Sequence, residues 1–223
     1  MRAIAKGAPP ATVTETKAAS TTDLSTPRRA RTAFDQIDKA VVRAALAREQ
    51  CWLCAFCMRR VDDQAADERG PTMKIAHRTP VAVDASQALT WKNLLGSCDG
   101  GQRSGGGSSC DLAQENSAIS VDPTETTHVA RLTYERREAA RGLFVTSTDP
   151  AHQDDLETAL NLNGGDLPAL RDAARRAFQE DARRTFPKGP WGKRAWLAHF
   201  PEWKGRRGSK LPEMLGVIQA LIR

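Results

Sequence analysis

The chain has 223 residues, of which 40% are hydrophobic, and these numbers allow one medium-sized domain or two small ones. No apolar run approaches the roughly 18 residues of a membrane-spanning helix, and no apolar signal segment follows Met1, so we expect a cytoplasmic protein without a membrane partner. The net charge of +6 is unevenly spread, because the residues from Asp166 onward hold 13 Lys or Arg and only 6 Asp or Glu. This excess predicts a polyanionic partner such as nucleic acid, although a solvated helix face explains it equally well.

The N-terminal part predicts an arm followed by a helix. Residues 1–31 contain few large apolar side chains and several prolines, so we expect them to be extended or partly ordered. Residues 32–50 predict a helix, because apolar side chains recur at helical spacing and charged side chains fill the other face. Thr32 is suited to cap the start of this helix.

The centre of the chain, residues 51–121, is rich in loop-forming residues. Residues 73–77 predict a short strand, which Pro80 ends. The glycine- and serine-rich stretch over residues 100–109 cannot form a core of its own and predicts a flexible loop.

The remainder of the chain predicts a hairpin and a series of helices. Residues 132–134 and 143–146 would pair around a turn at Gly142. Helices are expected over residues 154–162, 166–185, 191–200 and 212–222. The second of these helices is amphipathic and basic, which predicts either a partner-docking surface or a polyanion track. Its basic residues are Arg171, Arg175, Arg176, Arg183 and Arg184.

Five cysteines cluster in the centre, and in a chain of this size without a signal segment such clustering indicates metal before disulfides. Cys54 and Cys57 form a C-x2-C knuckle, although Cys51 precedes Cys54 by three residues and leaves the register open. The second pair would be Cys98 and Cys110, which the glycine-rich insertion can bring together at modest entropic cost. Four such thiolates suit structural zinc, and buried free thiols are the alternative.

His77 ends the strand expected over residues 73–77, and a lone histidine is more often structural than catalytic. Its neighbours in the sequence change that expectation. Asn93 places a side-chain amide between the apolar residues Trp91 and Leu94, and Asp111 places a carboxylate beside a candidate zinc ligand. We therefore consider His77, Asn93 and Asp111 as candidate catalytic residues.

The chain resembles the HNH endonucleases, and most closely the PtuB-like branch found in bacterial antiphage operons of the Septu type and in some retrons. The resemblance rests on the order Cys54, Cys57, KIAH ending at His77, WKNLL around Asn93, Cys98 and Cys110-Asp111. Further similar stretches are the opening MRAIAKGAPP, Glu49-Gln50, Asp122-Pro123 and LNLNGGDLPALR over residues 160–171. The resemblance therefore covers roughly residues 1–171.

This resemblance implies an α+β fold with a ββα-metal (HNH) core and structural zinc. The core would be flanked by an N-terminal arm and helix and by a helical C-terminal region. Three parts are implied: an extended arm over residues 1–31, a nuclease domain with zinc knuckles over residues 32–150, and a helical basic region over residues 151–223.

The resemblance also implies a role for each site residue. His77 would be the general base that deprotonates water, Asn93 would help to hold it, and Asp111 would bind a catalytic Mg²⁺ or Mn²⁺. The implied ligands of structural zinc are Cys54, Cys57, Cys98 and Cys110, which leaves Cys51 as the spare cysteine.

Two positions depart from the family pattern. Ala76 stands where many HNH sites have an acid that contributes to the metal site, and Gln114 stands where lysine is usual. Either another acid substitutes for the missing one, or metal binding is weak and conditional, or the site is inactive. The candidate substitutes are Asp84, Asp99 and Asp122.

The resemblance implies a metal-dependent endonuclease that cleaves nucleic acid, DNA in preference to RNA, as the effector of a bacterial antiphage system. Its partners would be nucleic acid, a PtuA-like ATPase subunit of the SMC or ABC type and, in a retron, a reverse transcriptase with its nucleic acid. The alternative is a zinc-stabilised nucleic-acid-binding or assembly subunit that has lost catalysis, which Ala76 favours. A zinc-ribbon transcription factor fits less well, since it gives His77 and Asn93 no role.

Overall fold

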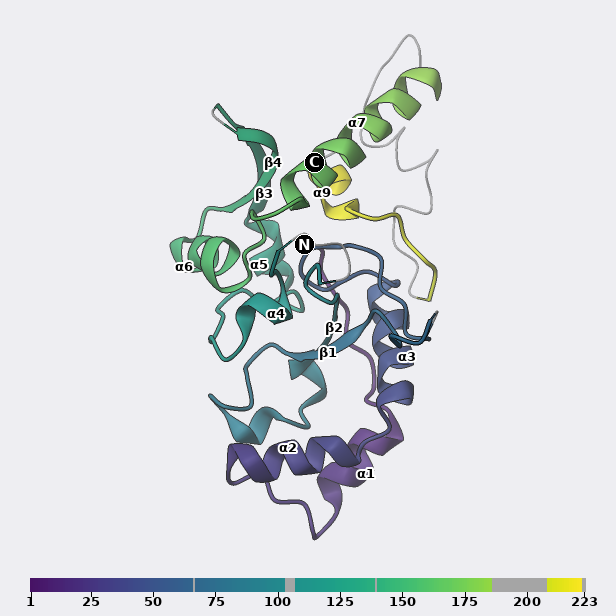
Figure 1. Ribbon diagram of the computed structural model, residues 1–223, viewed down its shortest axis with the longest axis vertical. Coiled ribbons are helices and arrows are strands. Elements are labelled where there is room, and N and C mark those ends of the chain that lie inside the picture. Colours follow the sequence, from purple (N-terminus) through teal and green to yellow (C-terminus); the bar gives the residue numbers. More distant parts are fainter. Residues whose placement is uncertain (66, 103–106, 139, 186–207, 222–223) are drawn as a thin grey trace.

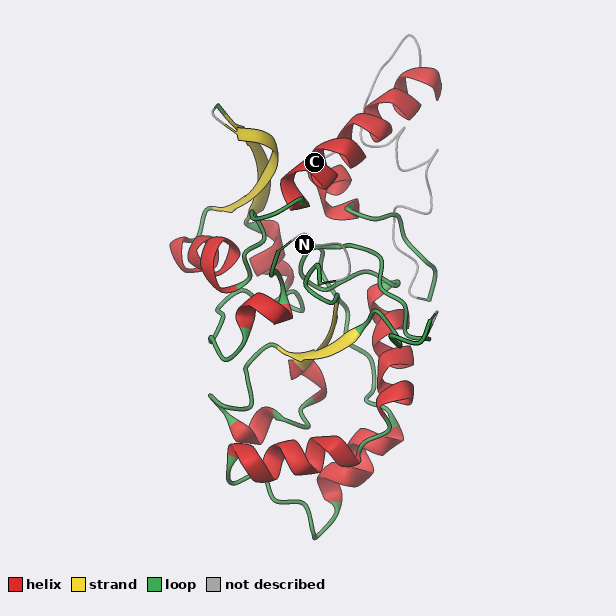
Figure 2. Ribbon diagram, in the orientation of Figure 1, coloured by secondary structure: helices red, strands yellow, loops and turns green. Residues whose placement is uncertain are grey.

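Helices and two small antiparallel sheets make up the described part of the chain, which is therefore an α+β protein, as the sequence predicts (Figure 2). The computed structural model describes residues 1–65, 67–102, 107–138, 140–185 and 208–221. None of the helices in these ranges combines the length and the apolar character needed to cross a bilayer.

The helices and strands follow one another along the chain as labelled in Figure 1. The first group is α1 (Ala11–Ala18), α2 (Pro27–Gln36), α3 (Lys39–Gln50), β1 (Lys74–His77), β2 (Leu94–Ser97) and α4 (Asp111–Gln114). Two short 3₁₀ turns, η1 (Ala85–Gln87) and η2 (Trp91–Asn93), lie between β1 and β2. The second group is α5 (Thr126–Ala130), β3 (Leu132–Arg137), β4 (Ala140–Ser147), α6 (Pro150–Asp154), the π-helical turn η3 (Asp155–Ala159), α7 (Leu167–Thr185) and α9 (Leu215–Leu221).

The N-terminal segment is more helical than the sequence indicates. Residues 11–18 form α1, where an extended arm was expected, because Val13 is buried in the core and fixes this turn of chain. The single helix expected over residues 32–50 is also wrong, since the chain breaks between α2 and α3. Asp38 causes the break, because its side chain accepts hydrogen bonds from the first backbone amides of α3 and caps that helix.

The first sheet is the antiparallel pair β1–β2, and it confirms the strand expected at residues 73–77. His77 is paired with Leu94 and Ala76 with Leu95. Helix α3 packs against both strands, and the buried core continues from there to the second sheet and α7. This arrangement surrounds the cysteine-bearing turns with apolar side chains.

The second sheet is the hairpin β3–β4, which the sequence predicts, but its turn lies elsewhere. The strands extend to Arg137 and Ala140, which pair with each other, so the chain reverses before Ala140 and not at Gly142. Gly142 has a φ of +116° inside β4, and a Cβ there would lie 2.6 Å from the carbonyl carbon of Pro168. Glycine is required because the backbone of α7 approaches this closely.

The C-terminal helices agree only in part with expectation. Helix α7 matches the one expected over residues 166–185, whereas the one expected over 154–162 begins earlier, as α6, and continues as a π-helical turn. Pro150 and the capping side chain of Asp149 set that earlier start. Helix α9 is shorter than expected, and the helix expected over residues 191–200 lies outside the described residues. The boundaries of the three predicted parts stay a prediction.

Candidate metal centre and catalytic site

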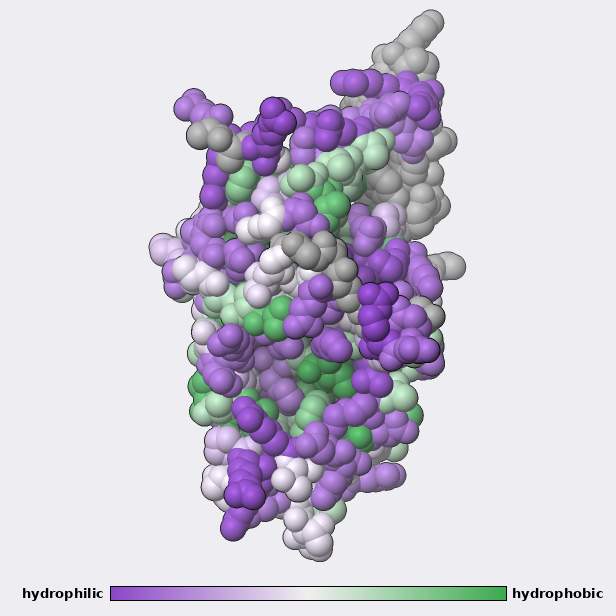
Figure 3. Space-filling view, in the orientation of Figure 1, coloured by the Kyte–Doolittle hydropathy of each residue, from purple (hydrophilic) through white to green (hydrophobic). Residues whose placement is uncertain are grey.

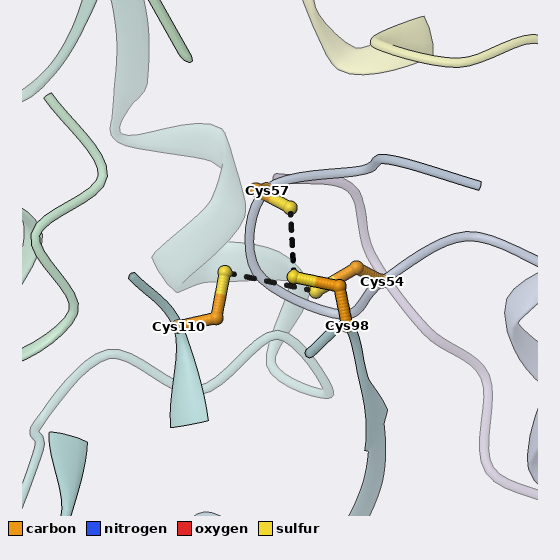
Figure 4. Close-up of side chains that lie close together, drawn as sticks. All are labelled: Cys54, Cys57, Cys98 and Cys110. Carbon is orange, nitrogen blue, oxygen red and sulfur yellow. Dashed lines mark hydrogen bonds between the residues drawn. The ribbon is translucent and has the colours of Figure 1, made fainter. Parts of the chain in front are cut away.

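Four buried cysteines bring their sulfur atoms close together (Figure 4). The Sγ atoms of Cys54 and Cys110 lie 3.8 Å apart, those of Cys57 and Cys98 lie 3.7 Å apart, and all four lie within 4.8 Å of one another. A tetrahedral zinc ion with Zn–S bonds of about 2.3 Å requires sulfurs about 3.8 Å apart. The four thiols therefore have the spacing that a metal such as zinc needs.

Cys51 lies outside this cluster. It ends α3 in a left-handed conformation with a φ of 57°, and it packs in a separate apolar cluster with Leu53, Met58 and Leu215. The structure thus resolves the register that the spacing left open, in favour of Cys54 and Cys57.

Gln50 ties the first pair of cysteines to the strand that carries Cys98. Its amide nitrogen donates to the carbonyl oxygens of Leu53 and Gly96, at 2.9 and 2.7 Å, and its Oε1 accepts from the Gly96 amide at 2.6 Å. The side chain is 1% exposed, so these bonds are shielded from water. Hydrogen bonds that involve no sulfur atom therefore also join the C-x2-C turn to β2.

The loop before α4 is held by the segment over residues 160–163. The amide of Cys110 donates to the Leu160 carbonyl at 2.8 Å, and the Asn161 side chain donates to the Ser108 carbonyl at 2.8 Å. Asn163 in turn accepts from the Val145 amide and donates to its carbonyl, which joins the segment to β4. The LNLN motif thus places the fourth cysteine.

Arg171 is buried close to the thiols, with 1% of its surface exposed. Its guanidinium donates to the carbonyls of Leu143 and Leu162 and to Asn163 Oδ1, and no carboxylate pairs with it among the described residues. Burial lowers the pKa of Arg171, while negative charge on Tyr134 and on the thiols opposes that change. A zinc ion with four thiolates carries a net charge of about −2, which suits an otherwise uncompensated buried cation.

Sequence reasoning placed Arg171 on an exposed basic face, and this was wrong. The side chain points inward from the same face of α7 as Leu167 and Phe178, which are also buried. The helical spacing of Arg171 from Leu167, four residues, is the signal that could have revealed it. Gln50 carried a similar signal, as a polar residue that ends the apolar face of α3.

His77 is half-buried at the end of β1. Its Nε2 lies 3.0 Å from the carbonyl oxygen of Ala88, and its ring meets the edge of Phe34 with ring centres 4.6 Å apart. Since a carbonyl oxygen can only accept, the neutral ring carries its proton on Nε2 and keeps the lone pair on Nδ1. Burial lowers the pKa of His77, the bond to Ala88 opposes this, and the charges of Lys39 and Arg31 add to the lowering.

Asn93 braces the loop between β1 and β2. Its Oδ1 accepts from the Thr79 amide at 2.8 Å, and its Nδ2 donates to the carbonyls of Thr79 and Gln87 at 3.0 and 3.2 Å. Gln87 directly precedes Ala88, whose carbonyl contacts His77. Asn93 thus fixes both ends of the loop that orients the imidazole.

Asp111 opens α4 beside the metal centre. Its amide lies 3.5 Å from the hydroxyl oxygen of Ser97, and its carboxylate has no hydrogen-bond or ion-pair partner within the described part of the chain. Burial, with a smaller contribution from the Cys54 thiolate, raises the pKa of this carboxyl to about 6. An unpartnered, largely buried carboxylate of this kind suits a divalent cation.

The side chain of His77 lies on the face of the β1–β2 hairpin opposite to Asp111, because successive side chains along a strand alternate between its two faces. Ala76 is 1% exposed and shares its face of the hairpin with Ser97, whereas His77 lies on the opposite face at the end of the strand. Gln114 nevertheless connects the two sides, because its side chain donates to the carbonyl of Arg78 at 2.7 Å. Helix α4 is therefore tied to the residue that follows His77.

The three candidate substitutes for the missing acid are engaged elsewhere. Asp84 caps η1, Asp99 accepts from the Gly101 amide, and Asp122 accepts from Thr124 and pairs with Arg78 at 3.2 Å. Among the described residues, the four cysteines form the one group of three or more His, Cys, Asp or Glu side chains that could hold a metal. No second group of three or more such side chains includes Asp111 in the part of the chain that the structure describes.

Comparison of the chain with models of known protein families found no match, and comparison with curated protein sequences found none either. The function must therefore be argued from the residues and their geometry.

Proposed function

We propose that this protein is a metal-dependent HNH endonuclease that hydrolyses phosphodiester bonds in nucleic acid, DNA in preference to RNA. The proposal rests on the resemblance of the motifs and on the order of the elements that carry them. The chain runs from β1, which ends at His77, through the loop with Asn93 and strand β2 to α4, which opens at Asp111. The resemblance implies this order of elements for a ββα-metal core.

The observation that supports the proposal best is the orientation of His77. With Nε2–H donating to the Ala88 carbonyl, Nδ1 is the nitrogen that can accept a proton from water. In the proposed reaction the water oxygen bonds to phosphorus, its proton passes to Nδ1, and the bond to the leaving oxygen breaks. The lowered pKa of His77 keeps the ring neutral and ready to accept at neutral pH.

Two metals would have separate roles in this scheme. Zinc on Cys54, Cys57, Cys98 and Cys110 would be structural, because four protein ligands leave no open position. Asp111 would hold Mg²⁺ or Mn²⁺, which when bound would offset the negative charge that develops on the phosphate.

A cleavage assay tests the proposal. Purified protein should nick or linearise plasmid DNA with Mg²⁺ or Mn²⁺, and EDTA should stop the reaction while the slowly exchanging structural zinc is retained. Labelled single-stranded DNA and RNA of one sequence, assayed in parallel, identify the preferred substrate. Cleavage that continues unchanged in EDTA would contradict a metal-dependent mechanism.

The second candidate is a zinc-stabilised nucleic-acid-binding or assembly subunit without catalysis. It is favoured by Ala76 and by the presence of a single unpartnered carboxylate beside α4. This candidate predicts that the protein binds nucleic acid with the same affinity in Mg²⁺ and in EDTA and leaves it intact in both. The two candidates are therefore distinguished by whether the nucleic acid is cleaved when Mg²⁺ is present.

We also propose that the nuclease acts in bacterial antiphage defence with an SMC- or ABC-like ATPase, or with a retron reverse transcriptase. The resemblance to PtuB-like nucleases motivates this, and so does the charge excess of the C-terminal quarter. Co-expression with the ATPase of the same operon should give a complex that survives size-exclusion chromatography. Separate elution of the two proteins would contradict the partnership.

A further inference from the structure

A pocket of about 660 Å³ lies between the outer end of the β3–β4 hairpin and the first turns of α7. In Figure 1 these two elements stand beside each other, and Figure 3 shows hydrophilic residues over the hairpin and over part of α7. Four arginines from three elements line the pocket: Arg136, Arg137, Arg141 and Arg176.

Small residues keep the pocket open. Gly142 and Ala169 line it where β4 and α7 approach each other. A Cβ at Gly142 would clash with the backbone of Pro168, so the glycine both permits this close packing and leaves the space above it free. The concave shape is therefore a consequence of how the hairpin meets the helix.

The charges around the pocket do not balance. Four arginines and two acids, Glu138 and Asp172, line the pocket, and Arg137 also pairs with Glu157 outside the lining. Asp172 is shared among Arg136, Arg175 and Arg176 at distances of 2.8–3.3 Å. Arg136 and Arg176 are 64% and 67% exposed, so most of their donors point to water. Arg141 is exposed and has no ion pair among the described residues.

Positive charge continues from the pocket along α7. Arg183 lies seven residues after Arg176, which is two helical turns and about 10 Å along the same face. Arg183 is exposed, as is Arg184 beside it, and Arg184 pairs with Glu180 on the preceding turn of α7. A free phosphate would contact only the pocket. A nucleic-acid chain with one phosphate in the pocket would also contact these arginines.

We propose that this pocket binds a backbone phosphate of a nucleic acid whose chain continues along α7. Guanidinium groups present paired donors that match the two free oxygens of a phosphodiester, and several of them from different elements fix its position. No aromatic or large aliphatic residue lines the pocket, so we expect contacts to the phosphate backbone and binding that is independent of sequence. The assignment deepens the proposed nuclease function, on which its choice of ligand rests.

A matched pair of variants at Ala169 tests the assignment. Ala169 is exposed on α7, and both Glu and Gln are good helix formers, so Ala169→Glu and Ala169→Gln add side chains of equal size and differ by one charge. Binding of a fluorescein-labelled 20-nucleotide DNA is measured by anisotropy in EDTA, where no cleavage occurs. The Glu variant should bind at least several-fold more weakly, and the Gln variant should bind nearly as well as the native protein.

A double variant, Arg141→Gln with Arg176→Gln, gives the second measurement. The slope of log K against log salt should fall by about 0.7–0.9 for each phosphate that the variant no longer neutralises. The control is Arg28→Gln with Arg48→Gln, which removes the same charge from exposed positions on α2 and α3 and should keep the native slope. An equal decrease of the slope in both double variants would overturn the assignment, because DNA binding would then depend only on the net charge of the protein.

The outcome separates this inference from the proposed function. Weak binding by Ala169→Glu together with an absence of metal-dependent cleavage would support the pocket and contradict the nuclease. Unchanged binding by Ala169→Glu in a protein that cleaves DNA would overturn the pocket alone. If Ala169→Glu binds DNA as the native protein does but no longer associates with an ATPase, the inference is also overturned, since the pocket would then bind protein.

Discussion

At the scale of single residues, the protonation state of His77 governs the proposed chemistry. The general base must be neutral, so activity should be lost as pH falls through the pKa of His77. Because burial and the nearby cations hold that pKa below the ordinary value of 6.5, the acidic limb of the pH–rate profile should lie below pH 6.5. Activity is then nearly constant around neutral pH.

Lys39 offers a test of this electrostatic account. Its ammonium lies over the Phe34 ring that contacts His77, and its charge lowers the pKa of the imidazole. Lys39→Gln should therefore move the acidic limb of the profile to higher pH. Lys74→Gln is the control, because Lys74 is exposed on β1 and has no part in the shift. An identical pH profile for Lys39→Gln and native protein would show that another group sets the limb.

At the scale of elements, α7 and the segment over residues 160–163 hold the metal centre from the C-terminal side. Arg171 joins them, since it bonds to the Leu162 carbonyl and to Asn163 while it lies near the thiols. Removing a buried cation beside an anionic centre leaves charge uncompensated, which costs roughly 3–5 kcal/mol. The helix is therefore expected to contribute to metal affinity without supplying a ligand.

Arg171→Met should lower the unfolding free energy by roughly 3 kcal/mol and speed the loss of zinc to a chelator. Arg183→Met removes an exposed arginine from the same helix and should change stability by less than about 1 kcal/mol. Urea unfolding and the rate of zinc release to a colorimetric chelator measure the two effects. Equal behaviour of the two variants would mean that Arg171 does not compensate the centre.

Local sequence signals predicted the elements that rest on short-range rules. The strand ending at His77, the two strands of the β3–β4 hairpin and helix α7 follow from the spacing of apolar residues, although the hairpin turn was expected at Gly142. The four clustered cysteines follow from the motif order. The helix at residues 11–18 could not be predicted, because it depends on burial of Val13 against distant parts of the chain. The inward position of Arg171 likewise depends on carbonyls contributed by β4 and the LNLN segment.

At the scale of the whole molecule, the four-cysteine cluster joins segments that are far apart in the sequence. Its cysteines come from the turn after α3, the end of β2 and the loop before α4, and one apolar core surrounds them. A structural zinc of this kind contributes roughly 10 kcal/mol or more to folding. The folded state should therefore depend on metal throughout, and not only near the knuckle.

Two serine variants distinguish the structural ligands from the spare cysteine. Cys54→Ser removes one of the four clustered sulfurs and should give protein that lacks zinc and is largely unfolded. Cys51→Ser alters a buried cysteine outside the cluster and should retain about one zinc per chain. Elemental analysis and circular dichroism give the result. Folded, zinc-free native protein would contradict the structural role of the metal.

The most direct test of the account is plasmid cleavage by His77→Ala compared with native protein at equal zinc content. The variant removes the imidazole and leaves the cysteine cluster, Gln50 and the LNLN segment in place, so it should fold and bind DNA as the native protein does. The account predicts that native protein cleaves with Mg²⁺ or Mn²⁺ and that His77→Ala reduces the rate by at least about a hundredfold. Cleavage at the native rate by the zinc-loaded variant would contradict it, because the base would then be another group.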